Sequence, residues 1–286
     1  MVIKQTDSQF KTLDQLKRHF YEKGWMVVKL PDPKPIYAAR TALLTELRGL
    51  TGNNNITLEQ YHQFIEDDSI HTDLQFQLTQ FFWNNQWATK IIGAQLNFFK
   101  LFLGEDINIQ SKPHLRITRP RKLKDNIGYH RDTFYSCSPF ELSVLVPYVD
   151  VPAESTLSVL SGSHIRPESD FPLTQIENPE IIKGSVKHQL GFPYAPKMID
   201  PSRTVNMQPV PLVLGEALIF SLATVHGSVE NRGEVSRWSS DIRVVNALAP
   251  LNPSLKPDYY ETLSRSVVTE LANIYHKAQL TTPVSV

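Results

Sequence analysis

From residue 114 onward the chain is a succession of short β-prone segments, and this feature limits the possible folds more than any other. The segments are apolar or rich in β-branched and aromatic residues, and turn residues separate them: "HLRIT", "GYHRDTFY", "ELSVLVPYV", "STLSVL", "PLVL", "EALIFSLATVHG" and "RWSSDIRVVNAL". Short strands at this spacing are typical of a β-sandwich or a jelly roll. We therefore expect a mainly β core in this half of the chain.

Residues 1–110 have a different character and predict helices. The segment "FKTLDQLKRHFYEKG" has apolar residues at helical spacing and ends at Gly24, after which "WMVVKL" is a short strand closed by Pro31. A second helix is expected after Pro35, and "LQFQLTQFFWNNQWATKIIGAQLNFFKLFLG" predicts one long helix or two consecutive ones. The expected fold class is mainly β with α, with a jelly-roll, cupin-like core packed by N-terminal helices.

The length of 286 residues fits one elaborated domain. Within it we expect a helical part over residues 1–110, a jelly-roll core over 111–250 and a C-terminal helix over 251–286. The core contains a long proline-rich insert over residues 165–211. A loop of that length inside a compact domain is typical of a lid or a binding loop.

The charge balance and the cysteine count exclude several classes of function. Lysine plus arginine and aspartate plus glutamate both number 29, so the whole protein has no general attraction for nucleic acid. The single cysteine, Cys137, excludes an internal disulfide framework, and the N-terminus lacks the pattern of a signal peptide. No apolar stretch reaches the length of a membrane span. We expect a cytoplasmic protein that acts on a small molecule, and the sequence leaves its oligomeric state open.

Two His-x-Asp pairs occur, and the expected local structure separates them. His71 and Asp73 precede "LQFQLTQFFW", which predicts a helix with Thr72 as its N-cap, and residues two apart on a helix do not face each other. His130 and Asp132 lie between β-prone segments, and residues two apart on a strand point to the same face. Only the second pair is therefore a candidate for metal chelation.

A metal held by His130 and Asp132 needs a further ligand, and His226 is the best candidate. It closes an apolar strand in "TVHGSVENRGEVSRWSSDIR", and two histidines with one carboxylate form the facial site of non-haem iron oxygenases. Arg237 follows on a strand that we expect to be adjacent and antiparallel, with Ser239 on the same face. An arginine beside an open iron site can bind a dicarboxylate through paired charge-assisted hydrogen bonds.

Together these residues resemble the signature of the Fe(II)- and 2-oxoglutarate-dependent dioxygenases: His130-x-Asp132, His226-Gly227-Ser228, Asn231 and Arg237-x-Ser239. Within that family the sequence is most similar to the phytanoyl-CoA dioxygenase-like group, in its carbohydrate and secondary-metabolite branch. Further similarity lies in "FYEKGWMVVKLPD", "TLSVLSGSH" and "GEALIFSLATVHGSVENR". The resemblance therefore extends well beyond the metal ligands.

The resemblance implies a double-stranded β-helix core in which the two histidines and the aspartate hold Fe(II), and 2-oxoglutarate chelates the iron through its keto acid. Arg237, with Ser228 or Ser239, would bind the distal carboxylate of 2-oxoglutarate. The implied reaction uses dioxygen, releases succinate and hydroxylates a small polar metabolite, with ascorbate as a candidate reductant. Because position 132 is an aspartate, the halogenating relatives, which have a small residue there, are a poorer match.

The residues leave other interpretations open. A cupin-like sugar- or metal-binding protein, or a cupin-type isomerase, shares the jelly roll without oxidising a substrate, and only the oxygenase needs an arginine for a dicarboxylate. The basic segment "KPHLRITRPRKLKD" is either a solvated strand and turn, or it brings Arg116 or Arg119 to 2-oxoglutarate or an anionic substrate group. His114 has the same ambiguity. Cys137 lacks a paired base and is not expected to be a nucleophile.

Overall fold

The long strand β11 (Arg237–Asn246) organises the larger of the β-sheets. The computed structural model describes residues 12–135, 137–174, 181–194, 196–228, 230–251 and 258–281. In the larger sheet the order is β1-β9-β4-β11-β2-β12, β3 also pairs with β11, and every pairing is antiparallel. These strands are β1 (Trp25–Lys29), β2 (Ile107–Gln110), β3 (His114–Thr118), β4 (Glu141–Pro147), β9 (Glu216–Ser221) and β12 (Tyr260–Ser264).

A smaller sheet lies across a cavity from the larger one. It has the order β10 (His226–Gly227), β5 (Ser158–Val159) and β8 (Gln208–Pro209), and a separate antiparallel pair joins β6 (Leu173–Thr174) to β7 (Met198–Ile199). Residues from both sheets line the same cavity, which places the cavity between them. Two antiparallel sheets around a central pocket agree with the jelly roll that the sequence predicts.

Alternation along β11 separates the hydrophobic core from the cavity. Trp238, Ile242 and Val244 are fully buried and belong to the core. The intervening side chains, from Arg237 to Arg243, line the cavity. Successive side chains of a strand point to opposite faces, so one strand supplies both the packing surface and a wall of the site.

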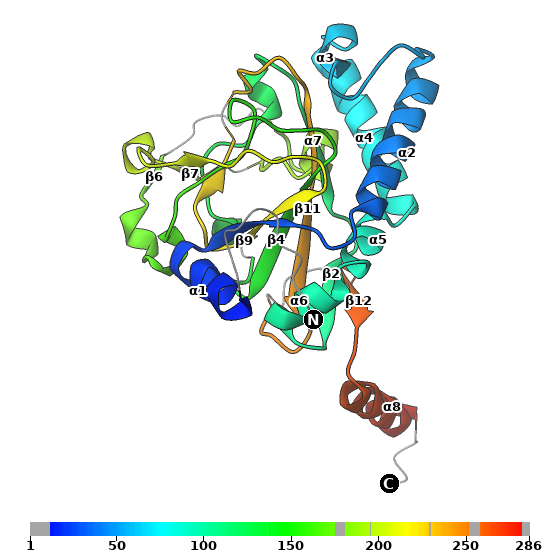
Figure 1. The fold of residues 1–286 in the computed structure, drawn as a ribbon, viewed down its shortest axis with the longest axis vertical. Helices are drawn as coiled ribbons and strands as arrows, with labels where there is room; N and C mark the ends of the chain where they lie inside the picture. The colour runs from blue at the N-terminus through cyan, green and yellow to red at the C-terminus, as the bar shows by residue number, and fades with distance from the viewer. Residues whose placement is uncertain are drawn as a thin grey trace.

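Helices from the first third of the chain cover the outer face of the larger sheet (Figure 1). α4 (Asp68–Asn84) lies against β3, where Gln75 Nε2 donates to the carbonyl of Leu115 at 2.8 Å. α2 (Lys34–Thr51) and α5 (Trp87–Gly93) pack on this layer. Their buried leucine, isoleucine and phenylalanine side chains each stabilise the fold by roughly 1.5–3 kcal/mol through removal from water. The helices thereby fix the position of β3, which forms part of the cavity wall.

The ends of the first helix show how local sequence sets these elements. α1 (Leu13–Lys23) begins where the side chain of Thr12 accepts a hydrogen bond from the Gln15 amide at 3.2 Å, and it ends at Gly24 in a left-handed conformation. The chain then enters β1, so the predicted helix and the strand "WMVVKL" are confirmed. The predicted second helix is α2, with Pro35 in its first turn.

Two predictions about the following helices are wrong. The N-cap of α4 is Asp67, whose carboxylate accepts hydrogen bonds from the next amides at 2.8 and 2.9 Å, whereas Thr72 lies inside the helix. The expected one or two helices are three, because the chain turns at Gln86, which has a positive φ of 52°, and again near Gln95. The short α3 (Tyr61–Phe64) precedes them and α6 (Leu96–Leu103) follows.

The expected C-terminal helix is wrong in its first part, and the helical N-terminal part also contributes a strand. Residues 260–264 form β12, which pairs with β2, because a tyrosine and threonine run suits an extended edge strand better than a helix. The helix itself is α8 (Val267–Thr281), and it projects from the body (Figure 1). β2 and β12 are far apart in the sequence, and local sequence patterns do not reveal pairing between distant strands.

The insert over residues 165–211 consists of short elements between β5 and β9, and it supplies β8 to the smaller sheet. Its described parts are η3 (Ser163–Ile165), η4 (Glu168–Asp170), α7 (Val186–Gln189) and η5 (Pro201–Arg203), together with β6, β7 and β8. α7 lies against α4. Residues 175–180 and 195 of this insert lie outside the described residues. Its role as a lid stays a prediction.

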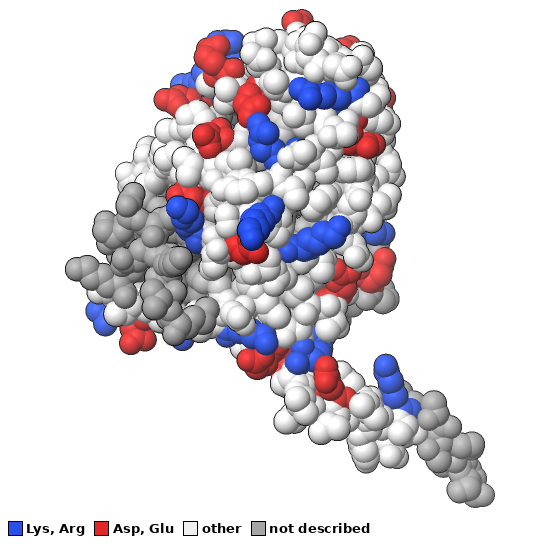
Figure 2. Space-filling model, turned by 45° about the vertical axis from the view of Figure 1, so that its right-hand side comes forward, with Lys and Arg blue, Asp and Glu red and all other residues white. Residues whose placement is uncertain are grey.

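The surface carries mixed charge. On the face shown in Figure 2, lysine and arginine side chains are interspersed with aspartate and glutamate, and they form no continuous basic field. The expectation that nucleic acid is not a partner stays a prediction. Among the described residues, no helix is both long enough and apolar enough to cross a membrane.

Candidate functional site

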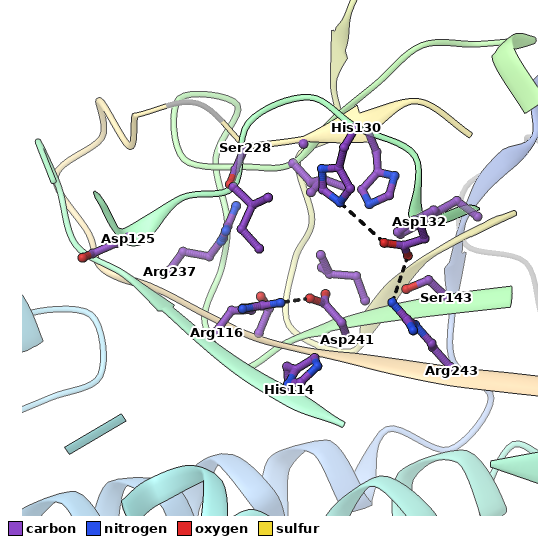
Figure 3. Close-up of a pocket in the computed structure, with 17 residues that line it drawn as sticks. His114, Arg116, Asp125, His130, Asp132, Ser143, Ser228, Arg237, Asp241 and Arg243 are labelled. Carbon is purple, nitrogen blue, oxygen red and sulfur yellow. Dashed lines mark hydrogen bonds and ion pairs between the residues drawn. The ribbon is translucent and has the colours of Figure 1, made fainter. Parts of the chain in front are cut away.

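Two neighbouring backbone segments bring the candidate metal ligands together (Figure 3). The His130 amide donates to the His226 carbonyl at 2.8 Å and the His226 amide donates back at 3.0 Å, which sets the ring centroids 4.5 Å apart. Asp132 begins η2 (Asp132–Tyr135), and its Oδ1 lies 3.5 Å from His130 Nε2. Each of the three buried side chains offers one ligand atom, and these atoms lie within 4.8 Å of one another.

The strand expected around His130 and Asp132 is wrong in part. Only His130 makes a β-bridge, and the chain then turns, with the Asp132 amide donating to the Leu222 carbonyl at 3.1 Å. This turn, and not strand alternation, directs the carboxylate to the histidines. The close approach explains Gly227, because a Cβ there would lie 2.7 Å from the carbonyl oxygen of Gly128.

Backbone carbonyls orient both imidazoles for metal binding. His130 Nδ1 lies 2.7 Å from the carbonyl oxygen of Gly128, and His226 Nδ1 lies 2.9 Å from that of Thr224. A carbonyl only accepts, so each Nδ1 carries the proton and each Nε2 keeps its lone pair. Burial, with the neighbouring His130, lowers the pKa of His226 to about 4. A metal ligand must be a neutral imidazole, and burial favours that form of His226.

Arg243 holds the second oxygen of the candidate carboxylate ligand. Its Nη2 lies 3.3 Å from Asp132 Oδ2, while its Nη1 donates to Tyr259 Oη at 2.7 Å and to Cys137 Sγ at 3.0 Å. Burial alone would raise the pKa of Asp132, but the Arg243 charge brings it below its usual range. Asp132 is therefore ionised and oriented before any cation binds. Burial raises the pKa of Cys137 to about 12, which agrees with its exclusion as a nucleophile.

Arg237 lies in the same cavity without a carboxylate partner among the described residues. The cavity has a volume of about 70 Å³, and the three candidate metal ligands line it together with Arg237. Arg237 is only 4% exposed, its Nη1 donates to the Ser155 carbonyl at 3.2 Å, and its Nε has no hydrogen-bond partner. Burial lowers its pKa to about 10, against the opposing charge of Asp241. A desolvated cation of this kind indicates a site for an anion.

Two serines accompany this arginine, as the sequence predicts. Ser239 is fully buried on the cavity face of β11, and its hydroxyl has no hydrogen-bond partner among the described residues. Ser228 lines the cavity from the smaller-sheet side and lies near Arg237 in Figure 3. The expectation that β11 neighbours the strand of His226 is wrong, because β10 pairs with β5 in the other sheet. Arg237 therefore faces the metal ligands across the cavity.

Arg116 connects the cavity wall to the insert. Its Nε lies 3.2 Å from Asp241 Oδ2, and its Nη1 and Nη2 donate to the carbonyls of Leu190 and Gly191 at 2.8 and 3.3 Å. A Cβ at Gly191 would lie 2.5 Å from His114 Nε2, so the insert backbone lies directly on this ring. The guanidinium of Arg116 is thus engaged in this conformation. A contact between Arg116 and 2-oxoglutarate stays a prediction.

Two further cavity residues, Asp241 and Arg243, were missed in the sequence. Both follow Arg237 and Ser239 at two-residue intervals, so the alternation that predicts Ser239 would also have found them. His114, whose role the sequence left open, lines the cavity and has an unpartnered Nδ1. Burial, reinforced by the charge of Arg116, holds the pKa of His114 well below its usual value, so its ring is neutral.

Arg119 has a structural role in place of a ligand contact. Its Nε lies 2.9 Å from Asp125 Oδ2 and its Nη2 lies 2.7 Å from Asp68 Oδ1. His71 completes this buried cluster, with Nε2 3.6 Å from Asp125 Oδ1 and Nδ1 3.1 Å from Tyr61 Oη. Asp73 does not belong to the cluster, as expected for a helical pair. These contacts brace the cavity wall at Asp125.

Comparisons with known proteins add the identity of the fold. No protein-family model matches the sequence, and no curated protein matches it. The solved structure of ThoJ, a non-haem monooxygenase, is 16% identical, covering 92% of this chain and 95% of ThoJ with a TM-score of 0.56. SnoN, a non-haem α-ketoglutarate-dependent epimerase from nogalamycin biosynthesis, is 19% identical, with coverages of 88% and 98% and a TM-score of 0.50.

A third solved structure supports the same assignment. EctD from S. alaskensis, determined with 2-oxoglutarate and 5-hydroxyectoine, is 14% identical and covers 93% of this chain and 88% of EctD with a TM-score of 0.51. The chain has the fold of these non-haem enzymes. The predicted double-stranded β-helix with N-terminal helices is therefore confirmed. At these identities the likeness concerns the fold, so the argument for function rests on the site.

Proposed function

We propose that this protein is an Fe(II)- and 2-oxoglutarate-dependent oxygenase that hydroxylates a small polar metabolite of carbohydrate or secondary-metabolite type. The observation that carries this proposal is the presence, in one cavity, of the His130, Asp132 and His226 cluster and the buried, carboxylate-free Arg237. A metal-binding protein of this fold would need only the cluster. A desolvated guanidinium beside it serves an anionic cosubstrate.

The cluster would hold Fe(II) through the Nε2 atoms of His130 and His226 and through Asp132, a ligand set that leaves positions open to other ligands. When bound, iron and 2-oxoglutarate supply the activation of dioxygen coupled to decarboxylation to succinate. Backbone carbonyls hold the Nδ1 proton of both imidazoles, which directs each Nε2 to the metal position, and Arg243 keeps the carboxylate ionised. These contacts fix the ligands before the metal arrives, which limits the entropy lost on binding.

Arg237 and Ser239 would bind the distal carboxylate of 2-oxoglutarate. Both offer donor atoms without hydrogen-bond partners, and both are buried, so the charge-assisted bonds form away from water. Ser228 would add a hydroxyl from the opposite wall. An uncharged sugar would leave the guanidinium without a counter-charge, whereas a carboxylate supplies it.

The polar walls of the cavity favour a substrate with hydroxyl or charged groups. Arg116, Asp241 and His114 line the wall beneath the insert, and a long acyl chain would offer these polar groups no hydrogen bonds. The insert itself carries further polar side chains, among them Lys187, His188, Tyr194 and Arg203. This combination supports a small polar metabolite.

Anaerobic titration tests the proposal. Wild-type protein is expected to bind one Fe(II), and addition of 2-oxoglutarate should produce the weak visible charge-transfer band expected by resemblance to the dioxygenases. His226→Ala should lose tight Fe(II) binding. The matched control is His276→Ala, which removes an exposed histidine on α8 and should bind Fe(II) like wild type. Stoichiometric iron in His226→Ala, or no band in wild type, would contradict the proposal.

The type of reaction is tested separately by turnover. Sugars, amino acids and acyl thioesters are screened for succinate release in the presence of Fe(II), ascorbate and labelled dioxygen. Hydroxylation places one labelled oxygen atom in the substrate and one in succinate. Succinate release with no label in the product would indicate another oxidative outcome, and product formation without dioxygen would favour an isomerase.

A further inference from the structure

The C-terminal helix α8 presents an apolar surface away from the rest of the protein. It follows β12 in the chain and projects from the body in both views (Figures 1 and 2). Its large apolar side chains are each more than 60% exposed: Val267 71%, Val268 76%, Leu271 62%, Ile274 63% and Tyr275 61%. A row of such side chains on one helix is unfavourable in water and marks a contact surface.

The base of α8 is fixed to the body by specific contacts. The Ser266 amide donates to Asp106 Oδ1 at 2.9 Å, and the Ser266 hydroxyl donates to Asp106 Oδ2 at 3.1 Å. Arg265 donates to the Ile107 carbonyl at 3.1 Å and to Asn108 Oδ1 at 2.6 Å. The direction of the helix is therefore set by the larger sheet. The chain holds the apolar surface outward instead of folding it onto its own body.

The apolar positions follow the spacing of a coiled-coil seam. Val267, Leu271, Ile274 and Ala278 are separated by four, three and four residues, which places them on one face of the helix. Val268 and Tyr275 flank this seam on one side, and the charged residues Glu270 and Lys277 flank it on the other. Val268 and Tyr275 are seven residues apart, and so are Glu270 and Lys277. The helix thus has the pattern of one strand of a helix pair.

We propose that α8 pairs with α8 of a second copy of this chain, antiparallel and around a two-fold axis between Leu271 and Ile274. In this register Leu271 faces Ile274 of the partner subunit. The same register sets Glu270 opposite the partner's Lys277, so the two charges are complementary on both sides of the axis. A parallel pair would place Glu270 beside the partner's Tyr275, where no charge pairing results.

The size of the contact predicts a weak, closed dimer. A helix of 15 residues is about 22 Å long, and one helix pair of that length buries less than a standard interface of roughly 1,600 Å². We expect a dissociation constant on the order of micromolar, so that the dimer depends on protein concentration. Because the axis is two-fold, association stops at two copies.

Sedimentation velocity on the full chain tests this proposal. Wild type should shift from monomer to dimer as its concentration rises from about 1 μM to about 100 μM. Leu271→Asp with Ile274→Asp should remain monomeric, since charges replace the seam. The matched control, Asn273→Asp, adds a charge on the opposite face and should dimerise like wild type.

A charge exchange tests the antiparallel register. Glu270→Lys should weaken the dimer by several-fold, because it places like charges beside the partner's Lys277, and so should Lys277→Glu. The double variant Glu270→Lys with Lys277→Glu should restore dimerisation. A wild type that stays monomeric throughout, or one whose dimer survives the aspartate variants, would overturn the proposal. Failure of the double variant to restore the dimer would overturn the register. Circular dichroism of each variant confirms that α8 and the body remain folded.

Discussion

At the scale of single residues, the proposed function depends most on Arg237. The side chain is buried, keeps an unpartnered Nε and makes no ion pair with a carboxylate of the described residues. Truncating one partner of a buried charge pair costs roughly 2–5 kcal/mol, or about one and a half to three and a half decades of affinity. Arg237→Gln should therefore weaken 2-oxoglutarate by this amount in an anaerobic titration of Fe(II)-loaded protein. Its Fe(II) affinity should be unchanged, because Arg237 is not a candidate ligand.

The control for this experiment is Arg121→Gln. Arg121 is exposed and its guanidinium pairs with Glu234 on the surface, at 2.7 Å, so its loss should affect neither ligand. The thermal stability of Arg237→Gln should also change little, since no ion pair within the described residues is broken. If Arg237→Gln binds 2-oxoglutarate as tightly as wild type, Arg237 is a structural residue and the cupin-like alternative gains support.

Arg243 gives a second prediction, which concerns the metal and not the cosubstrate. Removing it leaves the Asp132 carboxylate buried without its counter-charge and free to rotate. Arg243→Met should weaken Fe(II) binding by roughly 10–100-fold, the usual effect of losing a contact to a metal ligand. Isothermal titration under anaerobic conditions measures this change. Without metal, Arg243→Met should be less stable than wild type. Adding Fe(II) should partly restore that stability, because the cation replaces the lost positive charge beside Asp132.

The matched control, Arg121→Met, makes the same chemical change on the surface. It should leave both Fe(II) affinity and stability as in wild type. Equal Fe(II) affinities for Arg243→Met and wild type would show that Asp132 is positioned without Arg243. The clustering of the three candidate metal ligands was predictable because their residue types and order are informative. The Arg243 contact depends on a turn that only the folded chain reveals.

At the scale of elements, β11 shows what the sequence could and could not predict. Its alternation placed Ser239 beside Arg237 correctly, because side-chain direction on a strand is local. Its neighbours were predicted wrongly, because pairing with β3 and β4 brings together residues far apart in the chain. The same limit hid β12, which pairs with β2 across most of the sequence. Local patterns therefore predicted where strands lie in the sequence, and the structure shows which strands pair.

The insert over residues 165–211 gives a prediction at this scale. Arg116 holds the carbonyls of Leu190 and Gly191 against the cavity wall, so the insert and the cavity share a contact. Limited proteolysis should cut within the insert first, and Fe(II) with 2-oxoglutarate under anaerobic conditions should slow that cutting. Arg116→Gln should be cut faster than wild type, with Arg121→Gln as the control. A cutting rate that does not respond to the ligands would argue against a lid.

At the scale of the whole molecule, buried neutral histidines link stability to pH. Burial lowers the pKa of His71 and of His226 to about 4, and it holds the pKa of His114 well below its usual value. In the unfolded chain each has the ordinary value of 6.5. Between these values the unfolded state binds more protons than the folded state, so stability rises with pH and falls on acidification. The lowered pKa of Asp132 keeps its contribution intact across this window.

His71 allows this linkage to be measured away from the metal ligands. Its ring is 4% exposed and contacts Asp125 and Tyr61 behind the cavity wall. From pH 6.5 down to pH 5, a histidine that stays neutral in the fold costs roughly 2 kcal/mol. Urea titrations of metal-free protein at pH 7 and pH 5 should therefore show a smaller loss of unfolding free energy in His71→Gln than in wild type, by about that amount. The exposed His276→Gln should behave like wild type. Equal losses in His71→Gln and wild type would mean that His71 is protonated in the folded protein, as an ion pair with Asp125, and that the acid sensitivity comes from the histidines of the cavity.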